Sequence, residues 1–393
     1  MKQFFVVKPI IAYSAIGVAS MVTIFLLLKN SQPDIFSQET LEAYAIDISK
    51  ASSTPIIPEK TKQEIQQKTT PPKYVRGIYL SAYSAGQDKW RQQLIQKMKK
   101  GRINSVVIDI KDYTGYILYN SELETPKKLK TIKPIIKDLK KVLKEFKDAG
   151  IYTIARQTVF QDPVLAKIKP EWAMKKNNGG TWYNYSGLAW TNPQKKEVWD
   201  YNIAIAKEAD KFGFDEINFD YIRYPSDGNL KSLNYNLPAK KTKADVLENF
   251  FQYLSKELSS STNISVDMFG LVMDNTKTNY DLGIGQRLEK SLNYFDFTCP
   301  MMYASHYANG YLGFKNPALY PGKVVSYGIK ISQEAFKNKR ATLRPWLQAF
   351  SLGATYDKAR INEQITATEK ATSTSGWLLW NARNYYPDYI FNP

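Results

Sequence analysis

The chain has 393 residues, of which 43% are hydrophobic and 13% aromatic, and it carries a formal net charge of +17. This apolar content excludes a disordered protein, and the length suits one α/β barrel of about 250 residues with appended segments. The positive charge favours an anionic cell-wall polymer or membrane surface as partner over nucleic acid, because the basic residues form no recognised nucleic-acid motif.

The first segment is predicted to be a membrane anchor. Residues 10–28 contain no charge and are long enough to span a bilayer. Lys2 and Lys8 precede this run, which places the N-terminus in the cytoplasm by the positive-inside rule. No small-residue cleavage site follows, so we expect an uncleaved signal anchor over residues 1–29. It would cross the cell membrane once and leave the rest of the chain extracytoplasmic.

Residues 30–73 are predicted to form a flexible linker. This stretch is rich in Ser, Thr, Gln, Lys and Pro and shows little apolar periodicity, which is the composition of a disordered tether. The folded domain is therefore expected over residues 74–393. The lone Cys299 cannot form an internal disulfide and is expected to be a packing residue.

After the linker, strand patterns alternate with helix patterns, which predicts parallel strands joined by crossover helices. The eight expected strands are residues 75–82, 104–111, 152–159, 214–221, 264–271, 295–303, 343–351 and 377–381. The expected helices are residues 88–100, 133–149, 193–212, 239–259, 285–293 and 356–372, with a weak helical pattern between the sixth and seventh strands. Eight strands favour a closed (β/α)8 TIM barrel. An open doubly wound sheet is the alternative, although no Gly-x-Gly-x-x-Gly phosphate loop follows any strand.

The fourth expected strand carries acidic side chains into the barrel. Side chains alternate across a strand, so Glu216, Asn218 and Asp220 share one face while apolar residues share the other. In an α/β barrel the apolar face packs on helices, and the chemistry lies at the C-terminal end of the strand. That end holds Asp220, which is followed by Arg223.

Asp109, Asp220 and Asp267 each lie within an otherwise apolar strand. A buried carboxylate is costly unless it is paired or used in chemistry. Asp220 and Asp267 are on neighbouring strands and could flank one glycosidic bond, with Asp220 as nucleophile or base and Asp267 as general acid. Asp109 is either a reserve acid or the partner of Lys111 or Arg156 in a structural ion pair.

Arg156 and Arg223 are expected to hold one acid ionised, while an apolar pocket raises the pKa of the other. Polar and aromatic side chains at the strand ends are candidates for substrate binding: Tyr79, Asp112, Asn218, Tyr303, His306, Trp346, Gln348 and Trp380. The aromatic members suit stacking on a sugar ring. Trp182 and Trp190 bracket a long loop after the third strand, and we expect this loop to roof the cleft.

His306 is the only histidine of the chain. A zinc site usually needs more than one histidine, and a Ser-His-Asp triad would also need a nucleophile elbow that the sequence lacks. We therefore expect neither a metal nor a cofactor.

Short stretches of the barrel carry a family resemblance: Val75-Arg76-Gly77-Ile78-Tyr79-Leu80, Val107-Ile108-Asp109-Ile110-Lys111-Asp112, Ile151-Tyr152-Thr153-Ile154-Ala155-Arg156, Phe214 to Pro225, Gly283-Ile284-Gly285-Gln286 and Pro300-Met301-Met302-Tyr303. Through them, residues 74–386 resemble an uncharacterised bacterial family described as a "putative glycosyl hydrolase domain". The resemblance implies a glycoside hydrolase-like TIM barrel.

The fourth and fifth expected strands also resemble, more distantly, the corresponding strands of two other families. Chitinase-type barrels have three acidic positions where this chain has Asp215, Asn218 and Asp220, but their catalytic Glu falls on Ile222. Amylase-like barrels use an Asp nucleophile on strand four and an acid on strand five, which resemble Asp220 and Asp267.

The sequence therefore predicts a membrane-anchored glycoside hydrolase that acts on a polysaccharide, with the cell envelope as a candidate source. A non-catalytic glycan-binding or cell-wall scaffold protein on the same barrel is the alternative, because Ile222 replaces the chitinase acid. A transglycosylase is a third option.

Overall fold

Eight parallel strands close into a barrel within residues 68–392, the part of the chain that the computed structural model describes. Neighbours pair in the order β1, β13, β12, β10, β9, β7, β5 and β2, and β2 pairs with β1 to complete the ring. Their bounds are β1 (Val75–Leu80), β2 (Ser105–Lys111), β5 (Tyr152–Thr158), β7 (Glu216–Asp220), β9 (Asn263–Phe269), β10 (Phe297–Met301), β12 (Trp346–Gln348) and β13 (Gly376–Trp380). The predicted TIM barrel and its eight strands are confirmed; seven strands are shorter than expected, and β13 has the expected length but starts one residue earlier.

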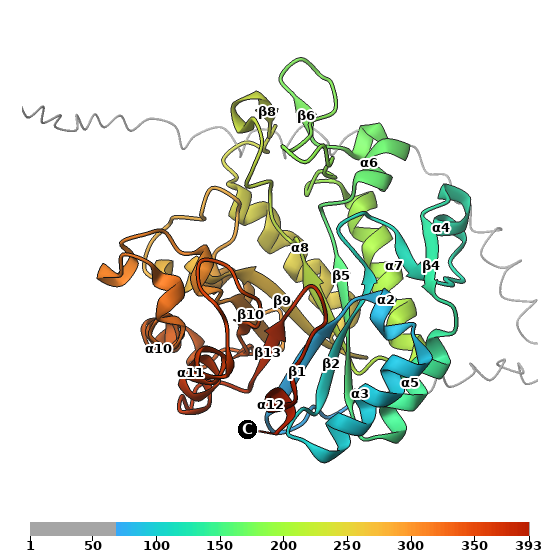
Figure 1. Cartoon of the computed structure of the whole chain (residues 1–393). Helices are drawn as coiled ribbons and strands as arrows, with labels where there is room; N and C mark the ends of the chain where they lie inside the picture. The colour runs from blue at the N-terminus through green and yellow to red at the C-terminus, as the bar shows by residue number, and fades with distance from the viewer. Residues whose placement is uncertain (1–67, 393) are drawn as a thin grey trace, which may run out of the picture. The chain divides into compact units, whose positions relative to one another are not determined.

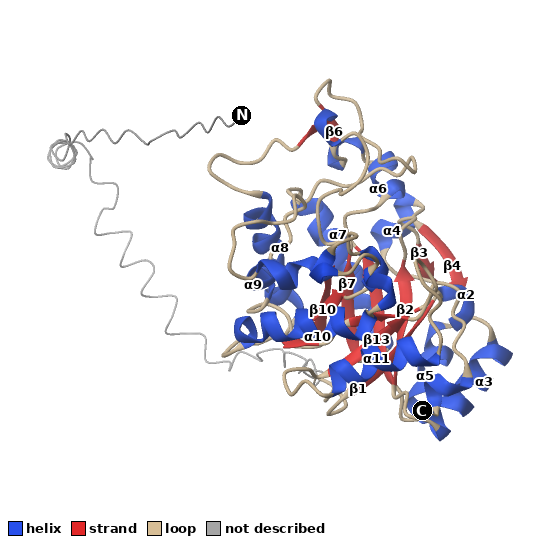
Figure 2. Ribbon diagram, turned by 60° about the vertical axis from the view of Figure 1, so that its left-hand side comes forward, coloured by secondary structure: helices blue, strands red, loops and turns tan. Residues whose placement is uncertain are grey.

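Helices surround the strands (Figure 2). They are α2 (Ala82–Ala85), α3 (Asp88–Lys100), α4 (Glu124–Leu129), α5 (Leu139–Asp148), α6 (Pro163–Ile168), α7 (Lys196–Phe212), α8 (Lys243–Leu258), α9 (Leu288–Ser291), α10 (Pro321–Ser332), α11 (Lys358–Glu369) and α12 (Asp388–Phe391). The weak helical pattern between the sixth and seventh predicted strands corresponds to α10.

α8 illustrates why these helices form and where they pack. It begins at a capping box in which the Thr242 side chain accepts a hydrogen bond from the Asp245 backbone N–H and the Asp245 side chain accepts one from Thr242. Leu247, Phe250 and Phe251 repeat at three- and four-residue spacing and are fully buried against the barrel. Each such side chain contributes about 1.5–3 kcal/mol to stability.

The predicted helix over residues 133–149 is wrong in its first part. Ile132–Ile136 form strand β4, and α5 starts after Asp138, whose side chain caps the helix. Pro134 and the β-branched isoleucines around it favour an extended backbone over a helix interior. β4 pairs with β3 (Ile117–Tyr119), which in turn pairs with β2.

Two segments that follow β5 and β7 meet beyond the C-terminal strand ends. β6 (Lys175–Lys176) pairs with β8 (Leu233–Asn234), and Figure 1 shows both at the end of the barrel opposite α12. Trp182 and Trp190 of this region are almost fully buried. They are packing residues of the loop, and neither is exposed to stack on a sugar.

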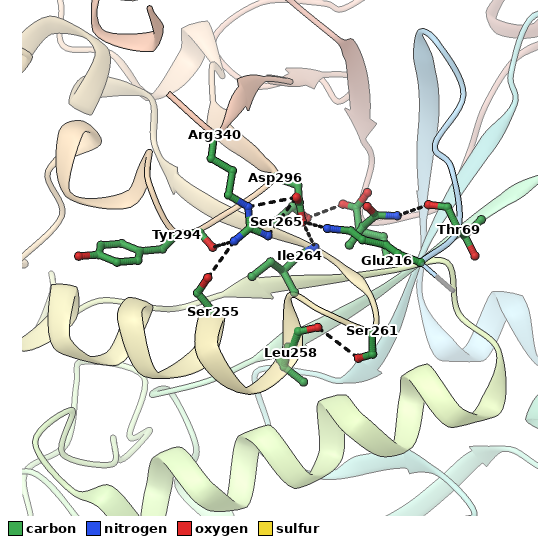
Figure 3. Close-up of polar contacts among 12 residues, drawn as sticks. Thr69, Glu216, Ser255, Leu258, Ser261, Ile264, Ser265, Tyr294, Asp296 and Arg340 are labelled. Carbon is green, nitrogen blue, oxygen red and sulfur yellow. Dashed lines mark hydrogen bonds and ion pairs between the residues drawn. The ribbon is translucent and has the colours of Figure 1, made fainter. Parts of the chain in front are cut away.

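Polar groups at the N-terminal strand ends hold the start of the described chain (Figure 3). Asp296 accepts hydrogen bonds from Lys68 Nζ at 2.8 Å and from Arg340 Nη2 at 3.0 Å. Asn263 donates to the carbonyl of Thr69 at 2.7 Å. The chain therefore enters the barrel at the face opposite the C-terminal strand ends.

A buried ion pair fills the barrel interior near the same end. Glu216 on β7 is paired with Arg344, whose Nη1 donates to Oε2 at 3.1 Å. Glu216 also accepts hydrogen bonds from Tyr152 at 3.1 Å and Ser265 at 2.5 Å. Cys299 is buried beside Arg344, at 3.9 Å from Nη2. Glu216, the inward-facing acid nearest the start of the fourth predicted strand, is therefore paired and hydrogen-bonded inside the barrel.

The predicted anchor over residues 1–29 and the linker up to residue 67 lie outside the described residues. Between residues 68 and 392, no helix combines the length and the apolar character needed to cross a membrane.

Candidate active site

Asp220 ends β7 at the C-terminal rim of the barrel. The next residue, Tyr221, has a φ of 51°, and such strained backbone is concentrated at functional sites. Its backbone N–H donates to Asp220 Oδ1 at 2.5 Å. The other oxygen, Oδ2, accepts hydrogen bonds from Arg156 Nε at 3.2 Å and from Arg156 Nη2. These donors on both oxygens stabilise a carboxylate.

Asp267 lies on β9, the strand next to β7, and is almost completely buried. Its Oδ1 accepts hydrogen bonds from Trp346 Nε1 at 2.7 Å and from Asn218 Nδ2 at 2.9 Å. Its Oδ2 lies 3.9 Å from Arg156 Nε. Burial, and next the negative charge of Asp220, raise the pKa of Asp267 well above its ordinary value.

Arg156 joins these two acids to a third. Its Nη1 donates to Asp109 Oδ1 at 2.6 Å, and the other oxygen of Asp109 accepts a hydrogen bond from the Tyr79 hydroxyl at 2.5 Å. Burial raises the pKa of Asp109. Two ion-pair partners were predicted for Asp109. Arg156 forms this ion pair, whereas Lys111 instead pairs with Asp162 at 2.8 Å.

A cavity of about 460 Å³ opens over this cluster, within the range of about 300–1,000 Å³ typical of small-molecule sites. Its wall includes these residues singled out from the sequence: Arg156, Asp220, Arg223, Asp267, Tyr303, His306, Trp346 and Trp380. Asp109, Tyr79 and Asn218 are not in the wall. They contact the residues that are, so we describe them as positioning residues.

Sequence reasoning missed several wall residues: Tyr221, Phe269, Gly270, Leu271, Met301 and Tyr307. Most are apolar, and their type gives no functional signal. Strand alternation could have found Phe269, because it lies two residues after Asp267 and shares its face.

Arg223 lies in the cavity wall but makes no ion pair with a carboxylate among the described residues. Its guanidinium carbon lies 4.8 Å from the ring centroids of Trp190 and Phe269 and 5.1 Å from that of Tyr221. Burial lowers the pKa of Arg223. The contacts expected of an orienting cation are therefore made by Arg156.

Two predicted substrate contacts lie away from the cavity wall. Asp112 Oδ1 accepts hydrogen bonds from the backbone N–H of Thr114 at 2.9 Å and from its hydroxyl at 2.5 Å, inside a turn. Gln348 is buried, accepts a hydrogen bond from Ser305 N at 3.2 Å and donates to the Phe350 carbonyl at 2.9 Å. Asp112 thus stabilises the turn after β2, and Gln348 joins the loops that follow β10 and β12.

The aromatic side chains form a connected wall. Trp380 stacks on Tyr79 with centroids 3.9 Å apart, and its ring centroid lies 4.9 Å from the guanidinium carbon of Arg156. Tyr303 is buried and makes a T-shaped contact with His306, with ring centroids 5.4 Å apart, and His306 is exposed at the cavity rim. Partial burial lowers the pKa of His306. An apolar wall beside carboxylates suits a ligand with both flat apolar faces and hydroxyl groups, such as a sugar.

The three aspartates surround a guanidinium, so their shared centre is already occupied by a cation. Within residues 68–392, no group of three or more His, Cys, Asp or Glu side chains has an arrangement that could hold a metal ion.

A family model described as "Putative glycosyl hydrolase domain" matches residues 77–386. The chain belongs to this family. The match runs from β1 to beyond β13 and includes the three aspartates and Arg156. The protein is thus a member of a glycoside hydrolase-like family, and the resemblance noted from its sequence is confirmed.

Among solved structures, the PgaB (BpsB) glycoside hydrolase domain from Bordetella bronchiseptica is similar, with a TM-score of 0.55 and 14% identity over 79% of this chain and 94% of that chain. This likeness shows a shared fold. A hypothetical protein from Ruminiclostridium thermocellum is 38% identical over 48% of this chain and 96% of its own, with a TM-score of 0.46. An α-galactosidase from Thermus thermophilus is 12% identical over 82% of this chain and 61% of its own, with a TM-score of 0.48. No curated protein in the comparison matches the chain.

Proposed function

We propose that this protein is a membrane-anchored, extracytoplasmic glycoside hydrolase that cleaves a polysaccharide, with Asp220 as nucleophile or base and Asp267 as general acid. One observation carries the proposal: the two carboxyl groups face the same cavity from adjacent strands, with Arg156 Nε within 4 Å of both. The family description supports the reaction class. The uncharged run before residue 29 supports the location.

The environments of the two acids suit different roles. A general acid must hold its proton near neutral pH, and burial raises the pKa of Asp267 in that direction. Asp220 instead receives hydrogen bonds from the Arg156 guanidinium and the Tyr221 backbone, which stabilise the negative charge that a nucleophile or base requires. Paired carboxyl groups with opposed environments are the arrangement that glycoside hydrolysis uses.

The geometry also limits the spacing of the pair. Because Arg156 Nε lies 3.2 Å from Asp220 Oδ2 and 3.9 Å from Asp267 Oδ2, these oxygens are at most about 7 Å apart. Retaining enzymes separate their carboxyl groups by about 5–5.5 Å and inverting enzymes by about 6.5–9.5 Å. This limit excludes most of the range of inverting enzymes and is compatible with retention, and NMR of the anomeric configuration of the first product would distinguish the two outcomes.

The central experiment compares the full chain with its Asp220→Asn and Asp267→Asn variants on a panel of soluble polysaccharides, by release of reducing ends. We expect wild type to cleave at least one glycan and each variant to lose about 10²–10⁴-fold in rate. Unchanged circular dichroism would show that the variants fold. Equal rates for wild type and a folded variant would rule out the assigned role.

One observation favours the alternative of a non-catalytic glycan-binding protein. Both oxygens of Asp220 already accept hydrogen bonds from protein groups, as in a structural ion pair. Such a protein would bind glycans without cleaving them, and wild type and Asp220→Asn would release equally few reducing ends.

A further inference from the structure

A second hollow lies next to the cavity and has no role in the proposed cleavage. It encloses about 620 Å³ and is lined in part by Ser305, Tyr307, Asn309, Phe314, Tyr320 and Leu352. We call this hollow, whose lining also contains Lys315 and Asn316, the outer groove. Tyr307 lines both the cavity and the outer groove, and Ser305 of the groove adjoins His306 of the cavity rim. The two hollows therefore share a wall.

The outer groove presents a fixed aromatic surface. Phe314 and Tyr320 are stacked with ring centroids 4.4 Å apart and an interplanar angle of 21°. Tyr320 is 40% exposed and Leu352 is 50% exposed. A rigid, partly exposed aromatic pair loses little conformational entropy when a flat ligand packs on it.

Hydrogen bonds hold the two loops that form this groove. Asn316, in the loop after β10, donates to the carbonyl of Gly353 in the loop after β12 at 2.9 Å. Gln348 accepts a hydrogen bond from Ser305 N at 3.2 Å. Gln348 thus helps to shape the groove through the backbone, although it does not line the cavity.

The distribution of exposed apolar side chains points to the same end of the barrel. Thirteen large hydrophobic side chains are exposed among the described residues, and twelve of them lie between the C-terminal end of a barrel strand and the main helix that follows it, some on short helices such as α2 and α6. Tyr327, on helix α10, is the exception. Of these exposed side chains, Leu271 lines the cavity, and Leu319, Tyr320 and Leu352 line the hollow beside it. Apolar groups exposed together in this way mark a binding surface.

We infer that the outer groove binds further sugar units of the same glycan chain whose cleaved bond lies in the cavity, so that the protein acts within long chains and discriminates against short ones. This inference rests on the proposed function for the meaning of the cavity. The wall residue Tyr307, which the two adjacent hollows share, and the exposed Tyr320 carry it. Lys315 is the one charged residue in the lining of the groove, and it faces no acidic lining residue there, so a neutral or anionic glycan meets no repulsion.

The kinetic test uses chain length as its variable. On a hexasaccharide or polymer that wild type cleaves, Tyr320→Ala should raise KM about 3- to 10-fold, the loss expected for one stacking contact. Its rate on an aryl glycoside of the corresponding single sugar should stay within twofold. Tyr327→Ala is the matched control, because Tyr327 is also 40% exposed but lies outside the groove. Equal losses on long and short substrates, or the same effect from both variants, would overturn the inference.

A binding test separates this inference from the proposed function. The full chain carrying Asp220→Asn is applied to an array of neutral and acidic glycans from one to six units long, with and without Tyr320→Ala. The inference expects retention that rises with chain length and falls when Tyr320 is removed. Binding of single sugars alone, or no binding, would refute it. Length-dependent binding without any hydrolysis by wild type would refute the proposed function. It would still support the outer groove as a binding site for further sugar units.

Discussion

Trp346 donates its indole N–H to Asp267 across 2.7 Å and thereby joins β12 to a carboxyl group of β9, over the intervening strand β10. The contact favours the ionised form of Asp267 and lowers its pKa, against the larger effect of burial. Trp346 therefore adjusts the proton affinity of the proposed general acid.

Trp346→Phe keeps an aromatic ring but removes this donor. The pKa of Asp267 should rise, because a hydrogen bond that stabilises the carboxylate is lost. Since a general acid works only while protonated, the basic limb of the kcat/KM profile should move to higher pH. Trp380→Phe is the control, since it alters the same wall while leaving the donors to Asp267 in place. A limb that stays in place, or moves to lower pH, contradicts the assignment.

Asp267→Asn should stabilise the protein at neutral pH while removing activity. The pKa of Asp267 is raised in the folded state, so the unfolded chain releases this proton at lower pH than the folded protein does. Stability from this group is complete below the ordinary pKa of about 3.9 and is lost as pH rises through the folded pKa. Urea unfolding at pH 4.5 and 7.5 should show a gain for the variant that is larger at pH 7.5. An equal effect at both pH values would exclude this linkage.

Asp109→Asn tests a positioning role. Asp109 holds Arg156 and Tyr79 but is not in the cavity wall, so we expect a loss of about tenfold in kcat/KM, below the 10²–10⁴-fold loss for Asp220→Asn. Tyr79→Phe removes only the hydroxyl that binds Asp109 and should cost less still. A loss for Asp109→Asn as large as that for Asp220→Asn would instead assign Asp109 to the chemistry.

The ion pair of Glu216 and Arg344 should matter for stability and not for catalysis. Arg344→Met leaves a buried carboxylate without its partner, which costs about 3–5 kcal/mol of the free energy of unfolding. Adding Glu216→Leu removes that charge and should recover about 1–3 kcal/mol. Urea unfolding of the single and double variants measures both values. A double variant no more stable than Arg344→Met would show that the unpaired charge is not the main penalty.

Asp112→Ala distinguishes a loop role from substrate binding. The Asp112 side chain accepts hydrogen bonds from Thr114 within a turn and lies outside the cavity wall. Substitution should leave kcat/KM within about twofold and cost about 1 kcal/mol of stability, as for other lost polar contacts. A selective rise in KM would restore the sequence-based assignment.

Sequence reasoning located the barrel because each strand repeats one simple signal, a short apolar run between helical patterns. It also identified Asp109, Asp220 and Asp267 as unusual, since burying a carboxylate in an apolar strand is costly unless the carboxylate is paired. It could not show that one guanidinium, Arg156, reaches all three, because that depends on how neighbouring strands are staggered.

The same reasoning was wrong at two places where the side chains do not follow the expected strand or helix pattern. Arg223 follows Tyr221, whose positive φ ends the strand alternation, so the side chain stacks among aromatic rings and does not meet the acids. At residues 132–136 the spacing of isoleucines fits a helix or a strand, and Pro134 decides for the strand.

The contacts of Lys68 and Thr69 lie at the opposite end of the barrel from the cavity. Anything joined to the chain upstream of Lys68 therefore connects to the barrel at the N-terminal strand ends, away from the loops around the cavity. Attaching the protein to a bead or electrode through its N-terminal side should leave the mouth of the cavity unobstructed. Attachment through the loops that carry Tyr320 or Leu352 should block it.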